Sequence, residues 1–153
     1  MLFLVSGYAA TERGSELIEP RDLIKAIYSA DLEHVSAFWD DWQGFERLVS
    51  SEKLANGATS SYINRTLYLV RLELMLRDSP GGNFMGLGHP SESFLQLVSS
   101  ARSFAVQRAG TEISPSSIDL LFAACSVDGD LSAALQHSGL RLEQLAAAVR
   151  DGT

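Results

Sequence analysis

The chain has 153 residues, of which 46% are hydrophobic and 20% charged, and its formal net charge is −7. This length and composition suit one folded domain with a packed core and argue against extensive disorder. The acidic balance excludes nucleic acid and anionic membrane surfaces as expected partners, because both require clustered lysine and arginine side chains.

The sequence predicts a reducing, cytoplasmic environment. The single cysteine, Cys125, cannot form an intrachain disulfide, and it ends the apolar run 120–125, so we expect a buried free thiol. The apolar start, residues 1–5, lacks the basic segment and the cleavage site of a signal peptide. No stretch reaches the roughly 18 apolar residues that a membrane span needs.

Helical periodicity dominates, and no alternation of apolar and polar residues is long enough to predict a strand. Four helices are expected in the first third of the chain, over residues 2–13, from residue 20, over 31–42 and over 45–49. Gly14 and Gly44 are expected to end helices, Pro20 to occupy a first helical turn, and Asp31 to serve as an N-cap.

The rest of the chain predicts one more long helix and then a second set of four. A polar loop, a strongly apolar helix and a glycine- and proline-rich linker are expected over residues 50–61, 62–77 and 78–90, respectively. Further helices are expected over residues 91–110, from residue 115, over 131–139 and over 142–149. Ser91 is the expected cap of the first of these, and Pro115 is expected to open the second.

The two ends of the chain share a sequence pattern. Residues 8–14 match 104–110, 18–23 match 113–118, 36–37 match 132–133, and 44–45 match 139–140. Alanine allows close helix crossing, glycine accepts the left-handed C-cap conformation, and an Ile-x-Pro connector restarts the chain as a helix. Because the matches follow one order, they predict a duplicated helical unit.

This double repeat resembles the N-terminal domain of the Clp chaperone ATPases. The segments that carry the resemblance are residues 18–27, 113–124 and 138–149. The match is closer over 91–149 and weaker after Val35 in the first half. The resemblance implies an all-α bundle of about nine helices with two pseudo-symmetric four-helix repeats. The repeats would cover 1–50 and 91–150, with the inserted helix and linker over 51–90.

Three departures from the family pattern limit what the resemblance implies. Aligning Met1 with Leu97 leaves the first helix about six residues short, and the family has a short linker where residues 62–77 predict a helix. Family members that bind phosphorylated arginine use a glutamate, and the matching positions here are Arg21 and Ser116. That activity is therefore not implied, and neither is ATP-driven unfolding, because the chain has no Walker motif.

The resemblance implies a protein-binding module without catalysis, metal or cofactor, which recognises a peptide, adaptor or degron in protein quality control. A Clp ATPase encoded elsewhere is one expected partner. The binding surface of the family lies near the start of the second repeat's first helix, which here points to Leu87, Glu92 and Gln96. A groove between the repeats would take an apolar or helical segment, and an acidic surface would favour basic partners.

Other interpretations remain open at this stage. The apolar helix over residues 62–77 could be a dimer interface of an assembly or immunity-type protein unrelated to proteolysis. Trp39 and Trp42 share a helix face and either pack in the core or anchor a partner. The acidic residues, which are either a solvated face or a site for a basic partner, are Asp31, Glu33, Asp40 and Asp41. An enzyme is not expected, because the histidines, His34, His89 and His137, form no metal or nucleophile–base pattern.

Overall fold

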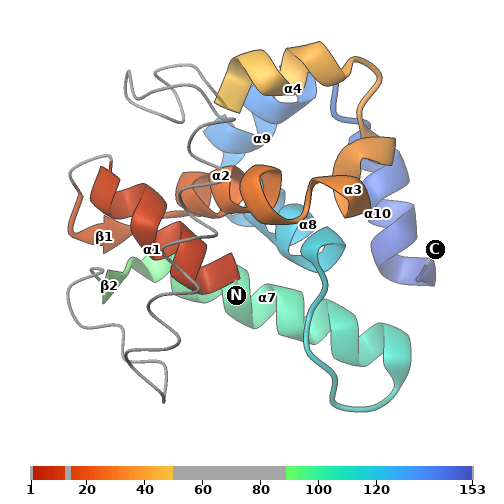
Figure 1. The fold of residues 1–153 in the computed structure, drawn as a ribbon. Coiled ribbons are helices and arrows are strands. Elements are labelled where there is room, and N and C mark those ends of the chain that lie inside the picture. Colours follow the sequence, from red (N-terminus) through yellow and green to blue (C-terminus); the bar gives the residue numbers. More distant parts are fainter. Residues whose placement is uncertain (1, 13–14, 50–88, 153) are drawn as a thin grey trace.

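The computed structural model describes residues 2–12, 15–49 and 89–152, which are mostly helical (Figure 1). The first helix group contains α1 (Leu2–Glu12), α2 (Pro20–Ala30), α3 (Leu32–Val35), a 3-10 turn (Ser36–Phe38) and α4 (Trp42–Val49). The second helix group contains α7 (Glu92–Ala109), α8 (Ser117–Val127), α9 (Gly129–His137) and α10 (Leu142–Asp151). The helical class is confirmed; the expected Gly14 stop and the loop, helix and linker over 50–88 lie outside the described residues.

A short parallel strand pair joins the two groups at one end. β1 (Leu17–Ile18) pairs with β2 (His89–Pro90). The His89 N–H donates to the Glu16 carbonyl at 2.8 Å, and the Ser91 N–H donates to the Ile18 carbonyl at 2.9 Å. The sequence did not predict these strands, because two residues are too few to show a period of two. The pair ties the connector before α2 to the start of α7.

Local sequence signals account for most of the helix ends. Pro20 opens α2, and the Ser91 hydroxyl caps α7 by accepting the Phe94 N–H at 3.1 Å. Gly110 ends α7 with a left-handed φ of 73°. Pro115 does not itself open α8, because Ser116 is the N-cap and the helix starts one residue later.

Helices α2 and α8 begin with the same device. An aspartate at the third helical position accepts the backbone N–H of the residue before the helix: Asp22 from Glu19 at 2.8 Å, and Asp119 from Ser116 at 2.9 Å. Arg21 is therefore the second residue of α2, whereas Ser116 precedes α8. Arg21 and Ser116, which the sequence pattern aligns, thus differ in helical position; the second residue of α8 is Ile118.

Gly44 does not end a helix, which corrects the expectation from sequence. The third expected helix ends with the 3-10 turn at Phe38, Trp39 is extended (φ −110°, ψ 134°), and Gly44 lies inside α4. A Cβ on Gly44 would stand 2.3 Å from the backbone oxygen of Ser138. Glycine is required here by close approach of α9, so the tertiary contact outweighs the low helix propensity of glycine.

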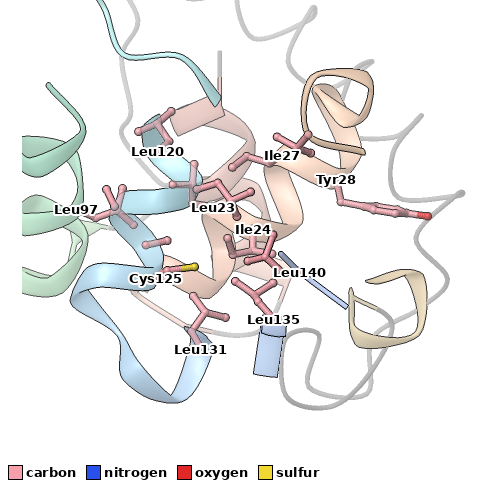
Figure 2. Packing of buried hydrophobic residues seen from close by; sticks show 14 of the residues in the cluster. Leu23, Ile24, Ile27, Tyr28, Leu97, Leu120, Cys125, Leu131, Leu135 and Leu140 are labelled. Atoms are coloured by element: carbon pink, nitrogen blue, oxygen red, sulfur yellow. The ribbon is translucent and has the colours of Figure 1, made fainter. Parts of the chain in front are cut away.

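The core is continuous across both helix groups. Helix α1 packs on α2, α7 packs on α8, and α2 also contacts α8. Figure 2 shows Leu23, Ile24 and Ile27 of α2 turned toward side chains of α8 and α9, and all three are at most 1% exposed. Burying an aliphatic side chain of this size contributes about 1.5–3 kcal/mol. Neither group could keep its apolar surface from water without the other.

Several alanines of α1 and α7 are buried, as the sequence pattern predicted. Ala9 and Ala10 on α1, and Ala101 and Ala105 on α7, are at most 2% exposed. Helix α1 has 11 residues against 18 in α7. No helix in the described ranges is both long enough and apolar enough to cross a membrane.

Candidate binding grooves between the helix groups

The two helix groups are joined where residues 38–41 meet residues 138–141, a contact that we call the junction. Trp39 forms an antiparallel bridge with Leu140. The Asp40 N–H donates to the Gly139 carbonyl at 3.0 Å, and the Arg141 N–H donates to the Phe38 carbonyl at 2.8 Å. The Arg141 guanidinium also pairs with the Asp40 carboxylate at 3.2 Å. Main-chain pairing thus sets the position of α4 relative to α9 and α10.

Trp39 packs in the core, which is the first of the two interpretations that the sequence left open for this residue. Its side chain is 6% exposed and stacks on Phe45 with ring centroids 4.0 Å apart. The indole N–H donates to the Ser138 hydroxyl at 2.9 Å, so the polar edge of the ring is satisfied within the junction. The side chain of Trp42 lies outside the described part of the structure.

Beside the junction lies an open groove of about 1370 Å³, which we call the junction groove. Its walls come from the start of α2, from α4, from the first turn of α7 and from α9. Apolar groups that face it belong to Pro20, Leu48, Leu131, Ala133 and Ala134. This volume exceeds that of ordinary small-molecule pockets, so the groove is large enough for several residues of a polypeptide.

Among the described residues that line the junction groove, carboxylates outnumber cations. Its acidic residues are Glu19, Asp41, Asp128 and Asp130, and its arginines are Arg21 and Arg47. Both arginines are paired, with Glu19 at 3.2 Å and with Asp41 at 3.6 Å. Asp128 caps α9 by accepting the Leu131 N–H at 3.0 Å, and Asp130 is exposed in the first turn of the same helix. The groove therefore presents an apolar wall with excess negative charge.

Of the residues proposed from the sequence, Glu92 and Gln96 do not line this groove. Glu92 and Gln96 are exposed on the first turns of α7, and Ser93, between them, lines the groove. Leu87 is outside the described residues. Sequence reasoning missed the groove residues because they come from four separate helices. The two nearby aspartates, Asp128 and Asp130, were the local sequence signal that could have indicated this groove.

The acidic residues noted in the sequence do not form one surface. Asp40 and Asp41 pair with arginines at the junction, and Asp41 lines the junction groove. Asp31 lies on another side of the molecule, where its carboxylate accepts the Ser117 hydroxyl and pairs with the His34 ring. Because the serine donates to the aspartate and not to the histidine, the three do not have the order of a Ser–His–Asp triad.

Asp31 and His34 belong to a second pocket of about 850 Å³, which we call the α7–α8 pocket. It is bounded by the start of α1, by α7 and α8, and by the loop that connects α7 to α8. Its lining residues are Leu2, Phe3, Asp31, His34, Arg102, Val106, Glu112, Ile113, Ser114, Pro115, Ser116, Ser117, Ile118 and Leu120. Within the described ranges, no group of three or more histidine, cysteine, aspartate or glutamate side chains is placed to hold a metal ion.

A buried ion pair holds the second helix group together. The Asp119 side chain is fully buried and binds the Arg108 guanidinium at 2.5 and 2.9 Å. The same guanidinium donates to the Val149 carbonyl of α10 at 2.8 Å. Burial by itself would raise the pKa of Asp119, but hydrogen bonds from Arg108 and Ser116 outweigh it, so this pKa lies below its usual value. The ion pair links α7, α8 and α10.

Cys125 is a buried free thiol, as predicted. Burial raises its pKa to about 11, partly opposed by a hydrogen bond with Ser132 and supported by the nearby Asp128 charge. At neutral pH the group is therefore a protonated thiol, which is a poor nucleophile. Its place in the core agrees with a packing role.

Comparison with known proteins does not assign the chain to a family. No family model matches the chain, and no curated protein or solved structure is significantly similar to it.

Proposed function

We propose that this chain is a protein-binding module, without catalysis of its own, that takes a basic and partly apolar polypeptide segment in the junction groove. The observation that carries the proposal is the groove itself. It is about 1370 Å³ in volume, it opens between two firmly joined helix groups, and it combines an apolar wall with surplus carboxylates. Clefts between packed helices that expose apolar surface are common sites for peptide segments.

The charge of the groove supports a basic partner. Arg21 and Arg47 each neutralise a carboxylate of the groove, whereas Asp130 is exposed and belongs to the chain's net charge of −7. Complementary charge speeds encounter and discriminates against acidic partners more than it adds affinity. An amphipathic helix or extended segment that carries lysine or arginine beside apolar residues fits these conditions.

We further propose that the module is a double repeat of the Clp N-terminal type, acting in protein quality control. Support comes from the order of the helices in each group and from the aspartate that starts both α2 and α8. The junction joins the residue stretch before α4 to the stretch before α10, as expected if these stretches are equivalent. The partner would be a Clp ATPase, one of its adaptors or one of its substrates.

A binding assay with a matched charge control tests the groove. The probes are two fluorescent peptides with the same leucine pattern, one carrying lysines and the other glutamates at the polar positions. Asp130→Lys should weaken binding of the basic peptide by about tenfold, as expected for loss of one charge contact together with added repulsion. Glu143→Lys makes the same charge change on α10, outside the groove, and should have little effect. Equal effects of the two variants, or equal binding of the acidic peptide, would contradict the proposal.

A cellular experiment tests the assignment to quality control. A photo-crosslinking amino acid at Ala133, which is exposed and lines the groove, should capture a Clp ATPase or its substrates. The same amino acid at Gln144, which is exposed on α10 away from the groove, should not. If only unrelated proteins are recovered reproducibly from the Ala133 position, the Clp assignment fails while the binding-module proposal stands.

The alternative of a dimeric assembly or immunity-type protein depends on the apolar helix expected over residues 62–77. Those residues lie outside the described part of the structure, so no observation here favours it. Size-exclusion chromatography with light scattering separates the two, because a strict monomer removes the dimer hypothesis.

A further inference from the structure

We infer that the α7–α8 pocket binds the C-terminal residue of a polypeptide, with Arg102 binding the terminal carboxylate and the apolar wall holding the last side chain. This inference rests on the proposed function, in that it assumes a protein partner, but it concerns a site separate from the junction groove. Among the described residues, none lines both pockets.

Arg102 differs from the other arginines in the described part of the structure. Arg21, Arg47, Arg108, Arg141 and Arg150 each pair with a carboxylate within 4 Å. Arg102 lines the α7–α8 pocket on an exposed face of α7, and no carboxylate or carbonyl of the described residues binds its guanidinium. In a chain with surplus acidic groups, a guanidinium left unpaired at a pocket is available for an external anion. A planar carboxylate fits its paired donors.

Apolar side chains flank this cation. Val106, one turn after Arg102 on α7, is 38% exposed, and Ile113 on the connecting loop is 41% exposed. Both line the pocket, together with Phe3 and Leu120. Large apolar side chains that remain in water beside a concave surface mark a place where apolar area can still be buried. A ligand that has an apolar group next to its carboxylate would contact both features.

The second unpaired charge in the pocket favours a peptide over a fatty acid. Glu112 lines the pocket, is exposed, and has no partner among the described residues, whereas Asp31 is already occupied by Ser117 and His34. A peptide C-terminus carries backbone N–H groups a few ångströms from its carboxylate, and these can donate to Glu112. A fatty acid has no such donor and would leave Glu112 unmatched.

A thermodynamic cycle tests the inference. The probe is a fluorescent hexapeptide ending in Leu-Leu, compared with the same peptide whose C-terminus is amidated. Amidation should weaken binding to the native chain by about tenfold, because it removes one charge-assisted contact. Arg102→Gln should weaken binding of the free acid by a similar factor, and amidation should then have almost no further effect. Arg150→Gln, which removes an exposed arginine on α10, is the matched control and should leave both affinities unchanged.

The outcomes distinguish this inference from the groove proposal. If the acid and the amide bind equally, or if Arg102→Gln retains the difference between them, the C-terminus assignment is wrong. Displacement of the peptide by a long-chain fatty acid, with no effect of Glu112→Gln on either ligand, would overturn the peptide in favour of a lipid. Asp130→Lys should not change binding of this probe. Its effect on the basic peptide therefore tests the groove independently.

Discussion

At the residue scale, Gly139 in the junction and Gly44 beside it show two different reasons why a position requires glycine. Gly139 has a φ of 112° and places its amide group beside residues 40 and 41. Gly44 has a helical conformation, but its Cα lies against the Ser138 backbone. One glycine is needed for its backbone conformation and the other for its lack of volume.

Replacing Gly44 with alanine should destabilise the protein by about 1–3 kcal/mol, because the added Cβ would lie 2.3 Å from a backbone oxygen that cannot rotate away. Gly129→Ala is the matched control, since a Cβ there meets nothing within 4 Å. Alanine at position 129 should be neutral or stabilising by up to about 1 kcal/mol. Urea unfolding followed by circular dichroism measures both, and an unchanged midpoint for Gly44→Ala would show that the contact is not close in solution.

At the element scale, the Arg108–Asp119 pair carries the packing of the second helix group. Asp119 accepts the Ser116 N–H at the start of α8 and also binds Arg108 from α7. Arg108 in turn donates to the Val149 carbonyl near the end of α10. A buried ion pair need not make the protein more stable than apolar residues in the same place would. Removal of one partner, however, leaves the other charge buried without an opposite charge, which is destabilising. Its main effect is to fix how α7, α8 and α10 meet.

Asp119→Asn should lower the free energy of unfolding by about 2–4 kcal/mol at pH 7. Because the pKa of Asp119 is lower in the folded state than its usual value of 3.8, its contribution is fully present above that value. The contribution is lost as the pH falls through that value toward the folded-state pKa. The stability difference between native chain and variant should therefore shrink between pH 5 and pH 2. Denaturant titrations at several pH values measure it.

The exposed pair of Arg150 and Asp151 provides the control for this prediction. Their side chains are 75% and 58% exposed at a separation of 3.3 Å, so solvent screens the interaction. Asp151→Asn should change stability by less than about 0.5 kcal/mol at any of these pH values. A pH-independent difference for Asp119→Asn would mean that the buried carboxylate does not titrate with a lowered pKa.

At the scale of the whole molecule, the core connects both helix groups, and residues from α2, α4, α7, α8 and α9 form one cluster. Figure 1 shows α2 and α8 at the centre, with α4 and α9 together on one side and α7 on the other. Because the two helix groups share this core, unfolding of one group should destabilise the other.

We therefore expect a single cooperative unfolding transition. In a Trp42→Phe variant, Trp39 is the single tryptophan. Its fluorescence then reports on the junction, since its ring stacks on Phe45 and its indole N–H donates a hydrogen bond to Ser138. Far-ultraviolet circular dichroism reports on all helices. The two probes should give the same midpoint in urea, and loss of Trp39 burial well before loss of helix would show that the groups separate before they unfold.

Much of the local structure followed from sequence patterns with a physical basis. Pro20, Ser91 and Gly110 each occupy the helix end that their chemistry predicts, and Ala9 and Ala10 of α1 and Ala101 and Ala105 of α7 are buried. Cys125 was expected in the core because its neighbours are apolar. These predictions needed only backbone geometry and the cost of exposing apolar area, which nearby residues determine.

The tertiary structure alone decided the role of Gly44, the pairing of β1 with β2, and which side chains line the two pockets. Leu87, Glu92 and Gln96 were proposed from one short stretch, whereas each pocket collects residues from several helices. Whether Arg102 is paired depends likewise on which carboxylates the fold brings near it. A sequence specifies which residues prefer a helix end or a buried face, but distances between residues far apart in the chain arise only when the helices pack.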